Sequence, residues 1–306
     1  MRIAVMGTGG VGGYFGAKLA AAGNDVTFIA RGAHLAALRE RGLRIESGTS
    51  PLHLTDVQAT DNPKSVAPVD IVMFCVKLWD VEQAASQIDS LVSTGGAAIP
   101  FQNGLVAPEV LGRVLGPAHV LGGVAYIAAT IREPGVIAHT GTMARLRVGA
   151  FTGGPVERAT RFADASQAAG IDVEVSTDVR RALWEKFCFL SALSGCTSVA
   201  RQPVGAIRSD PDLRATFEAA VLEAWTVGRA QGVLLADDFV AAQLKTLDAL
   251  PAEMRSSMQN DLAGGRRLEA PWLSGAVVAL AKDAGIAAPV SGVLYAALKP
   301  YVAGAA

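Results

Sequence analysis

A glycine-rich turn between a short apolar run and a helical pattern limits the folds open to this chain more than any other feature. The turn consists of Gly7, Thr8, Gly9, Gly10, Val11 and Gly12. It matches G-x-G-x-x-G, in which the first glycine makes the turn, the second admits a pyrophosphate and the third lets helix approach strand. A strand at 2–6 precedes the turn, and a helix at 11–22 and a strand at 25–29 follow it. This order predicts a dinucleotide-binding site with the phosphates at the helix N-terminus.

The residues after the second strand indicate which dinucleotide is bound. NAD enzymes place a carboxylate there for the ribose 2'-hydroxyl, whereas NADP enzymes place a cation for the 2'-phosphate. Here the chain reads Ile29-Ala30-Arg31-Gly32, without an acidic residue. A guanidinium can bind a phosphate through two hydrogen bonds and stack on adenine. We therefore expect NADP(H) as the cofactor with Arg31 on its 2'-phosphate, and a solvated surface arginine is the alternative.

The rest of the sequence predicts an α/β domain followed by an all-helical domain. Further strands are expected at 71–76 and 97–101, helices at 33–41 and 81–91, antiparallel edge strands within 120–149, then a helix at 155–169 and a strand at 172–175. Beyond residue 177 the pattern is helical, at 179–193, 213–231, 237–250, 273–284 and 290–301. We expect two domains. Residues 1–176 bind the cofactor, and residues 177–306 contribute the side chains that bind the substrate and catalyse the reaction.

Composition excludes several other classes of protein. With 51% hydrophobic residues, 18% charged residues and a net charge of −1, the chain is too apolar for a disordered protein and too neutral to grip nucleic acid. No apolar run approaches the ~20 residues of a membrane helix. The three cysteines lie in apolar stretches, and their odd number argues against a disulfide framework. We expect a cytoplasmic protein without membrane or nucleic-acid partners, and the spacing of its histidines predicts no metal site.

Polar residues follow two of the expected strands at the edge where open α/β sheets bind ligands. Lys77 ends the apolar run at 71–76, and Gln102-Asn103-Gly104 follows the strand at 97–101. Lys77 and Asn103 therefore suit a nicotinamide pocket. The alternative is ordinary turn chemistry, because Asn-Gly is a common turn pair.

The helical region offers a second set of candidate residues. Lys186 lies in an apolar helical pattern. Helical spacing places it on one stripe with Leu190 and Ser194, and we expect this stripe to line the substrate site. If Lys186 faces a cleft, desolvation would lower its pKa and suit it to protonate a developing alkoxide, but a lysine in such a helix usually reaches out to water. Ser257 and Glu269 complete the set. The alternative for Ser257 is a helix-capping hydroxyl, and the alternative for Glu269 is a solvated surface charge.

These motifs, in this order and spacing, resemble the ketopantoate reductase (2-dehydropantoate 2-reductase) family over residues 1 to about 295. The motifs are the glycine turn, Arg31, Val76-Lys77, Gln102-Asn103-Gly104, Trp184-Glu185-Lys186, Ser256-Ser257-Met258 with Asp261, and Glu269. The resemblance implies a Rossmann-type domain followed by a helical domain, and NADPH-dependent reduction of a 2-keto acid in the pathway to pantothenate and coenzyme A. It also suggests a homodimer.

The resemblance also implies a role for each matching residue. Lys186 matches the general acid, Glu269 the acid that holds substrate and lysine, and Ser257 the hydroxyl that meets the substrate carboxylate, while Lys77 and Asn103 line the cofactor and substrate cleft. The chain departs from the family at Leu190, Ser194 and Val204, where family members carry asparagines. We therefore expect either ketopantoate or a less polar 2-keto acid as substrate. A sensor that binds NADP(H) without turnover is the non-enzymatic alternative.

Overall fold

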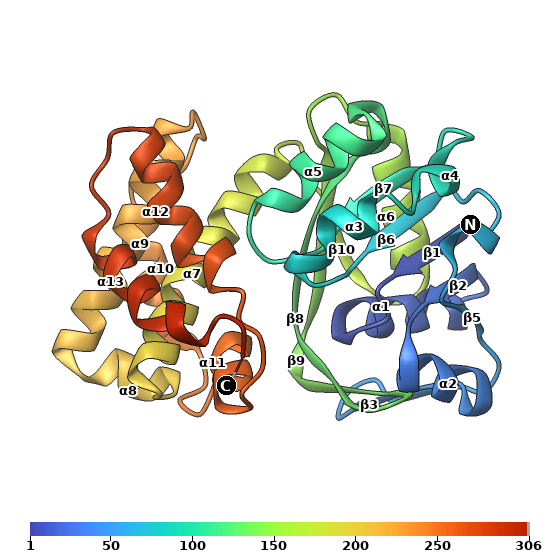
Figure 1. Ribbon diagram of the computed structural model, residues 1–306, viewed down its shortest axis with the longest axis horizontal. Helices are drawn as coiled ribbons and strands as arrows, with labels where there is room; N and C mark the ends of the chain where they lie inside the picture. Colours follow the sequence, from blue (N-terminus) through green and yellow to red (C-terminus); the bar gives the residue numbers. More distant parts are fainter. Residues whose placement is uncertain (305–306) are drawn as a thin grey trace. The chain divides into compact units, whose positions relative to one another are not determined.

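Five parallel strands form the first sheet of the computed structural model, which describes residues 1–304 (Figure 1). Their order is β5 (Gln58–Thr60), β2 (Asp25–Ile29), β1 (Arg2–Met6), β6 (Ile71–Phe74) and β7 (Ala97–Pro100). The chain starts in the middle at β1 and then builds outward on both sides, as in doubly wound dinucleotide-binding sheets. The four expected strands are present, whereas β5, only three residues long, was not expected.

A second sheet is built around the long strand β9 (Val136–Ala150). It pairs antiparallel with β8 (Leu121–Glu133) and parallel with β3 (Leu43–Ser47) and β10 (Asp172–Val175), and β4 (Leu52–Leu54) lies beside β3. The expected antiparallel pair is confirmed. The prediction that both are edge strands is wrong for β9, because β3, which was not expected, and β10 both pair with it.

Helix α1 (Gly10–Ala21) packs against strands of both sheets, and its glycines set how closely they approach. A Cβ atom on Gly16 would lie 2.8 Å from the Phe28 ring of β2, and one on Gly13 would lie 2.8 Å from the Ile137 side chain of β9. A Cβ on Gly10 would lie only 2.0 Å from the backbone oxygen of Ala129 in β8. Backbone cannot move aside as a side chain can, so a larger residue at position 10 would strain the fold.

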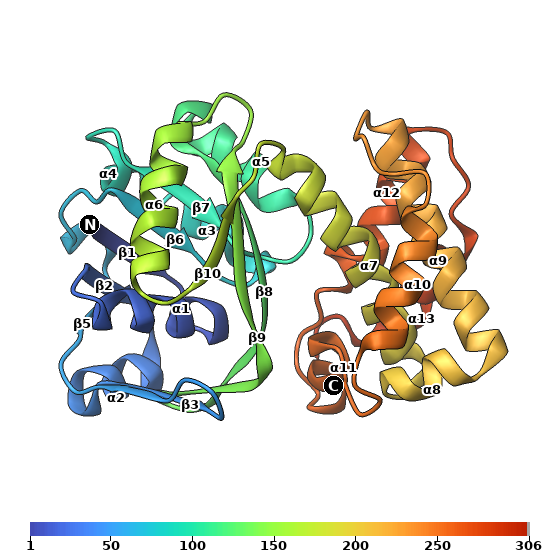
Figure 2. The ribbon, with the colours of Figure 1, turned by 180° about the vertical axis from the view of Figure 1, so that it is seen from behind.

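The remaining helices of this region lie on the outside of the sheets, and Figure 2 shows α6 beside β10. They are α2 (Gly32–Arg41), α3 (Val81–Ala85), α4 (Asp89–Val92), α5 (Val106–Leu115) and α6 (Val156–Ala168). The single helix expected at 81–91 is wrong, because α3 ends at Ala85 and α4 begins only at Asp89. The amides of Gln87 and Ile88 then bond three residues back, which tightens the chain into a turn.

Seven helices make up the last part of the described chain, as expected for a helical domain. They are α7 (Val179–Ala200), α8 (Val204–Ser209), α9 (Pro211–Ala230), α10 (Phe239–Ala249), α11 (Ser257–Ala263), α12 (Ser274–Asp283) and α13 (Pro289–Leu298). The short helices α8 and α11 were not expected, and α7 continues past residue 193, where it was expected to end. Within residues 1–304, no helix is long and apolar enough to cross a membrane.

Two hydrophobic cores divide the chain into two compact units. The first unit contains residues 1–102 and 106–182, and the second contains residues 103–105 and the chain from Leu183 onward. Tyr14, Phe28 and Phe162 are buried in the first core, and Phe187 and Phe217 in the second. The domain boundary after residue 176 stays a prediction, while the segment 103–105 belongs with the helices although it follows a strand of the parallel sheet.

Candidate functional site

The glycine turn is fastened to the end of strand β2. The amides of Gly7 and Thr8 donate to the Ile29 carbonyl at 3.2 and 3.3 Å, and the Thr8 hydroxyl donates to the same oxygen at 3.1 Å. Gly7 has a φ of +97°, in the region that favours glycine. A Cβ on Gly12 would lie 2.4 Å from the Gly7 carbonyl oxygen, so the helix begins directly against the turn. The turn is thus a fixed backbone surface at the carboxyl edge of the sheet.

Open space at Gly9 fits this turn to a phosphate ligand. Among residues 1–304, a Cβ on Gly9 would meet no atom within 4 Å. Gly9 is also the N-cap of α1, and as a glycine it has no side chain to accept a hydrogen bond from the first-turn amides. Such amides, together with the positive end of the helix dipole, form an anion site. The arrangement of Gly7, Thr8, Gly9, Gly10, Val11 and Gly12 therefore suits the pyrophosphate of a dinucleotide.

Arg31 lies just after the end of strand β2, at the position the sequence predicted. It is exposed, follows β2 by two residues and precedes α2. Among residues 1–304, no ion pair or side-chain hydrogen bond engages its guanidinium. Its five N–H donors are thus available to a ligand at this strand end.

Lys77 and Gln102 mark the carboxyl ends of the neighbouring strands β6 and β7. The Gln102 side-chain amide donates to the Val76 carbonyl at 3.0 Å, which ties the two strand ends together. Lys77 is exposed, and its Nζ lies 5.5 Å from the centre of the Trp79 ring. Both side chains follow the strand ends as expected, and Gly104 has the positive φ of +84° that a turn after Asn103 requires.

A lysine and an amide distant in sequence meet in the helical unit. The Nζ of Lys186, on α7, donates to Oδ1 of Asn103 at 2.9 Å. Lys186 is only partly exposed. Burial lowers the pKa of Lys186 to about 8, and the negative charge of Glu269 opposes that effect. Asn103, Lys186 and Glu269 are therefore the predicted site residues that the structure brings together.

Glu269 is a buried carboxylate, with 9% of its surface exposed, just before the short 3-10 helix Ala270–Trp272. A buried charge needs compensation, and an ammonium ion nearby supplies it. At neutral pH the pair therefore favours a protonated Lys186. The site thus combines an amine whose pKa burial lowers to about 8 with a carboxylate whose negative charge opposes that shift.

Ser257 is exposed at the first residue of α11, and the capping role belongs to its neighbour Ser256. The Ser256 hydroxyl accepts from the Gln259 amide at 3.1 Å and lies 2.8 Å from the Thr197 hydroxyl of α7. Ser256 entered the sequence analysis only as part of the Ser256-Ser257-Met258 motif and Thr197 not at all, although Ser-x-x-Gln is a capping-box pattern. They hold the start of α11 against α7 and leave the Ser257 hydroxyl facing outward.

The three positions that depart from the family asparagines are apolar or closed. Ser194 and Val204 have no exposed surface, and Leu190 is partly exposed one turn from Lys186. Within residues 1–304 the Ser194 hydroxyl has no hydrogen-bond partner. A substrate contact at Ser194 stays a prediction, since it would require its neighbours to move.

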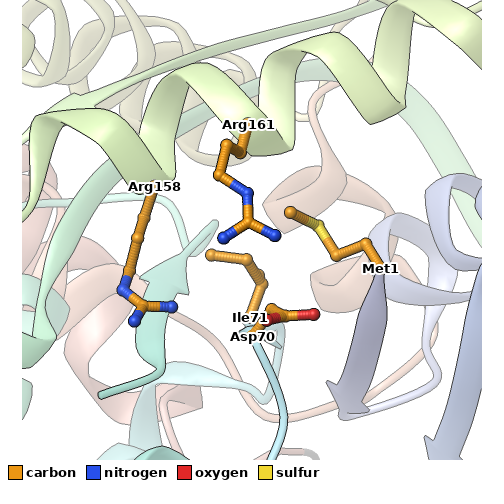
Figure 3. Close-up of a pocket in the computed structure, with 5 residues that line it drawn as sticks. All are labelled: Met1, Asp70, Ile71, Arg158 and Arg161. Carbon is orange, nitrogen blue, oxygen red and sulfur yellow. The ribbon is translucent and has the colours of Figure 1, made fainter.

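Two arginines of α6 reach toward the opposite end of the sheet, where β6 begins (Figure 3). Arg158 and Arg161 line a depression with Met1, Asp70 and Ile71. The depression has essentially no room for a water molecule. It is therefore no candidate for a ligand site.

Comparison with known proteins assigns the chain to a family of oxidoreductases. Residues 3–153 match the family model Ketopantoate reductase PanE/ApbA, and residues 178–302 match the model Ketopantoate reductase PanE/ApbA C terminal. A 2-dehydropantoate 2-reductase of Halobacterium salinarum is 33% identical over 291 residues, 95% of each chain. The chain belongs to the ketopantoate reductase family.

Solved structures share the complete fold. A PanE/ApbA family ketopantoate reductase from Ralstonia eutropha JMP134 is 32% identical with a TM-score of 0.90, over 99% of this chain and 98% of that one. A D-mandelate dehydrogenase solved with NADH and anilino(oxo)acetate has a TM-score of 0.91 over 99% of this chain and 98% of that one. At 19% identity, that second likeness shows the fold alone.

Proposed function

We propose that this protein reduces ketopantoate to pantoate with NADPH, with Lys186 as the general acid. Membership of the ketopantoate reductase family supports the reaction class. The glycine turn and the unpaired guanidinium of Arg31 support NADPH as the cofactor. The observation that carries the proposal is the Lys186 amine, which Asn103 holds at 2.9 Å and whose pKa burial lowers to about 8.

The bound nicotinamide would supply a hydride to the carbonyl carbon of the keto acid. As the C=O bond opens, Lys186 gives a proton to the oxygen, and the product is a hydroxy acid. Asn103 orients the amine through its side-chain oxygen, and Glu269 stabilises the ammonium form before the transfer. The exposed Ser257 hydroxyl would donate to the substrate carboxylate, and Lys77 would contact the cofactor.

The test is a steady-state assay of NADPH oxidation with purified protein and ketopantoate, beside a panel of bulkier and less polar 2-keto acids. Efficient turnover of ketopantoate supports the proposal. If ketopantoate is turned over weakly and another keto acid strongly, the reduction of a 2-keto acid by NADPH would still hold, but ketopantoate would not be the substrate. Tight NADPH binding without any turnover across the panel would instead favour a sensor.

Leu190 supports a second candidate function, the reduction of a less polar 2-keto acid. It lies on α7 one turn after Lys186, and Ser194 and Val204 add no exposed amide. A site that hydrogen-bonds a substrate hydroxyl rejects analogues that lack it, and this site has fewer such partners. Changing Leu190 to Asn should then improve kcat/KM for ketopantoate relative to an apolar keto acid. Unchanged relative values would count against this candidate.

A further inference from the structure

A hollow of about 310 Å³ lies in the helical unit, at the far end of α7 from Lys186. It is lined by Arg201, Leu262, Ala263, Gly265, Arg266 and Tyr301. Arg201 follows Lys186 by fifteen residues, most of them on one helix, so the two side chains start about 22 Å apart along α7. The hollow is therefore separate from the Lys186 cluster, and its volume lies at the lower end of the range for small-molecule pockets.

Arg201 has an unusual backbone for a residue with a side chain. It directly follows the end of α7 and has a φ of +55°, a conformation that glycine or asparagine usually provides at a helix end. A non-glycine residue in this region costs conformational energy, and such residues concentrate at functional sites. The strain gives a first reason to look for a use of this side chain.

The charge of Arg201 has no counter-ion in the part of the chain that the structure describes. Its guanidinium lies 5.9 Å from the centre of the Tyr301 ring and makes no ion pair or hydrogen bond with residues 1–304. The second arginine of the hollow differs, because Arg266 donates to the Asp261 carboxylate at 2.7 Å and to the Asn260 carbonyl at 3.1 Å. Arg201 is thus the charge that a ligand in the hollow would meet.

We propose that this hollow binds a small organic carboxylate with a flat apolar body. The carboxylate would accept two parallel hydrogen bonds from Arg201, the geometry for which a guanidinium is suited. The body would rest on the Tyr301 ring, which is 44% exposed, and on the Leu262 side chain. The Arg266–Asp261 pair closes one wall without competing for the anion.

Benzoate and its neutral isostere benzamide are the probes, titrated calorimetrically into the full chain. We expect saturable benzoate binding and at least tenfold weaker binding of benzamide. Arg201→Gly should lower benzoate affinity at least tenfold while the chain stays folded, because glycine suits a φ of +55°. Arg201→Asn, which also accepts this conformation, provides a second variant if the glycine form is unstable.

Two controls separate this pocket from other carboxylate sites. Ser257→Ala removes the hydroxyl proposed to meet the keto-acid substrate and should leave benzoate affinity unchanged. Thr152→Gly changes the other non-glycine residue of positive φ among residues 1–304, at +44°, and should also leave it unchanged. Absence of saturable benzoate binding, equal binding of benzamide, or loss of binding in Ser257→Ala but not in Arg201→Gly would overturn the proposal. None of these readouts depends on turnover of a keto acid.

Discussion

The Nζ of Lys186 lies 2.9 Å from Oδ1 of Asn103, although 83 positions separate the two residues in the chain. Asn103 follows a strand of the parallel sheet, yet it belongs to the helical unit with Lys186. An amide oxygen accepts a hydrogen bond and cannot donate one, so the contact favours the protonated amine. The pair therefore joins an orienting amide to the amine that we propose as the proton donor.

Removal of the Lys186 amine should cost most of the catalytic rate. Because general acid catalysis typically contributes 10²- to 10⁴-fold, Lys186→Ala should lower kcat for keto-acid reduction by about that factor. The dissociation constant for NADPH, measured by cofactor fluorescence, should stay within about twofold of the wild type. A variant with near-wild-type kcat would remove Lys186 from the mechanism.

The rate of reduction should depend on pH through the same amine. Since burial lowers the pKa of Lys186 to about 8 and the protonated form is the acid, kcat should be level below pH 8 and fall as the pH rises further. Asn103→Ala removes a partner of the charged form, so the fall should begin at lower pH. A profile in Asn103→Ala that matches the wild type would show that the contact does not tune this proton.

Stability should respond to pH in the opposite sense. The folded chain binds the Lys186 proton less tightly than the unfolded chain, whose lysine has a pKa near 10.5. Between these values the unfolded state holds more protons, so the free energy of unfolding should rise from pH 8 to 10.5, by up to about 3 kcal/mol. Urea denaturation of the wild type and of Lys186→Met at pH 7.5 and 10.5 measures this, since only the wild type should show that increment.

Arg31 should discriminate between the two nicotinamide dinucleotides. Arg31→Ala should raise KM for NADPH at least tenfold and change KM for NADH by less than about twofold, because only NADPH carries the 2'-phosphate. Initial rates with each cofactor at saturating keto acid provide the measurement. Equal effects on both would refute the assignment of Arg31.

Alanine substitutions at two neighbouring glycines of the turn should have different effects, one on ligand binding and one on stability. A Cβ on Gly9 meets no atom within 4 Å, so Gly9→Ala should fold normally and lose dinucleotide affinity where the phosphates need the space. A Cβ on Gly10 would lie 2.0 Å from the Ala129 carbonyl oxygen, so Gly10→Ala should destabilise the fold by about 1–3 kcal/mol. Thermal unfolding and NADPH titration of both variants separate the two effects. Normal stability of Gly10→Ala would contradict the close contact.

The sequence was sufficient for the elements whose pattern is local. Strands β1, β2 and β10 have the expected bounds, because each is an apolar or alternating run ended by turn residues. The strands β3, β4 and β5 were missed. Strand β3 pairs with β9 and β5 pairs with β2, partners far along the chain, and β4 is a three-residue strand beside β3. The single helix predicted at 81–91 from its apolar spacing is interrupted, because the amides of Gln87 and Ile88 bond three residues back and form a turn.

The candidate site was predictable in its residue types and not in its contacts. The motif order indicated Lys186, Asn103 and Glu269, but no spacing rule shows that the amine of Lys186 meets Asn103 rather than solvent. The cap of α11 was placed on Ser257 in one interpretation and belongs to Ser256. The capping-box spacing from Ser256 to Gln259 was a usable signal. The closed surroundings of Ser194 arise from packing between helices, which a single sequence does not display.

The glycines of α1 also determine the thermodynamics of ligand capture. The close contact between the start of α1 and Ala129 of β8 is formed by backbone atoms, which have no alternative rotamers. The amides at the start of this helix are consequently immobilised before any ligand arrives. Binding of a dinucleotide there therefore requires little ordering of a loop and costs little conformational entropy. We expect a preorganised site whose affinity is limited by desolvation.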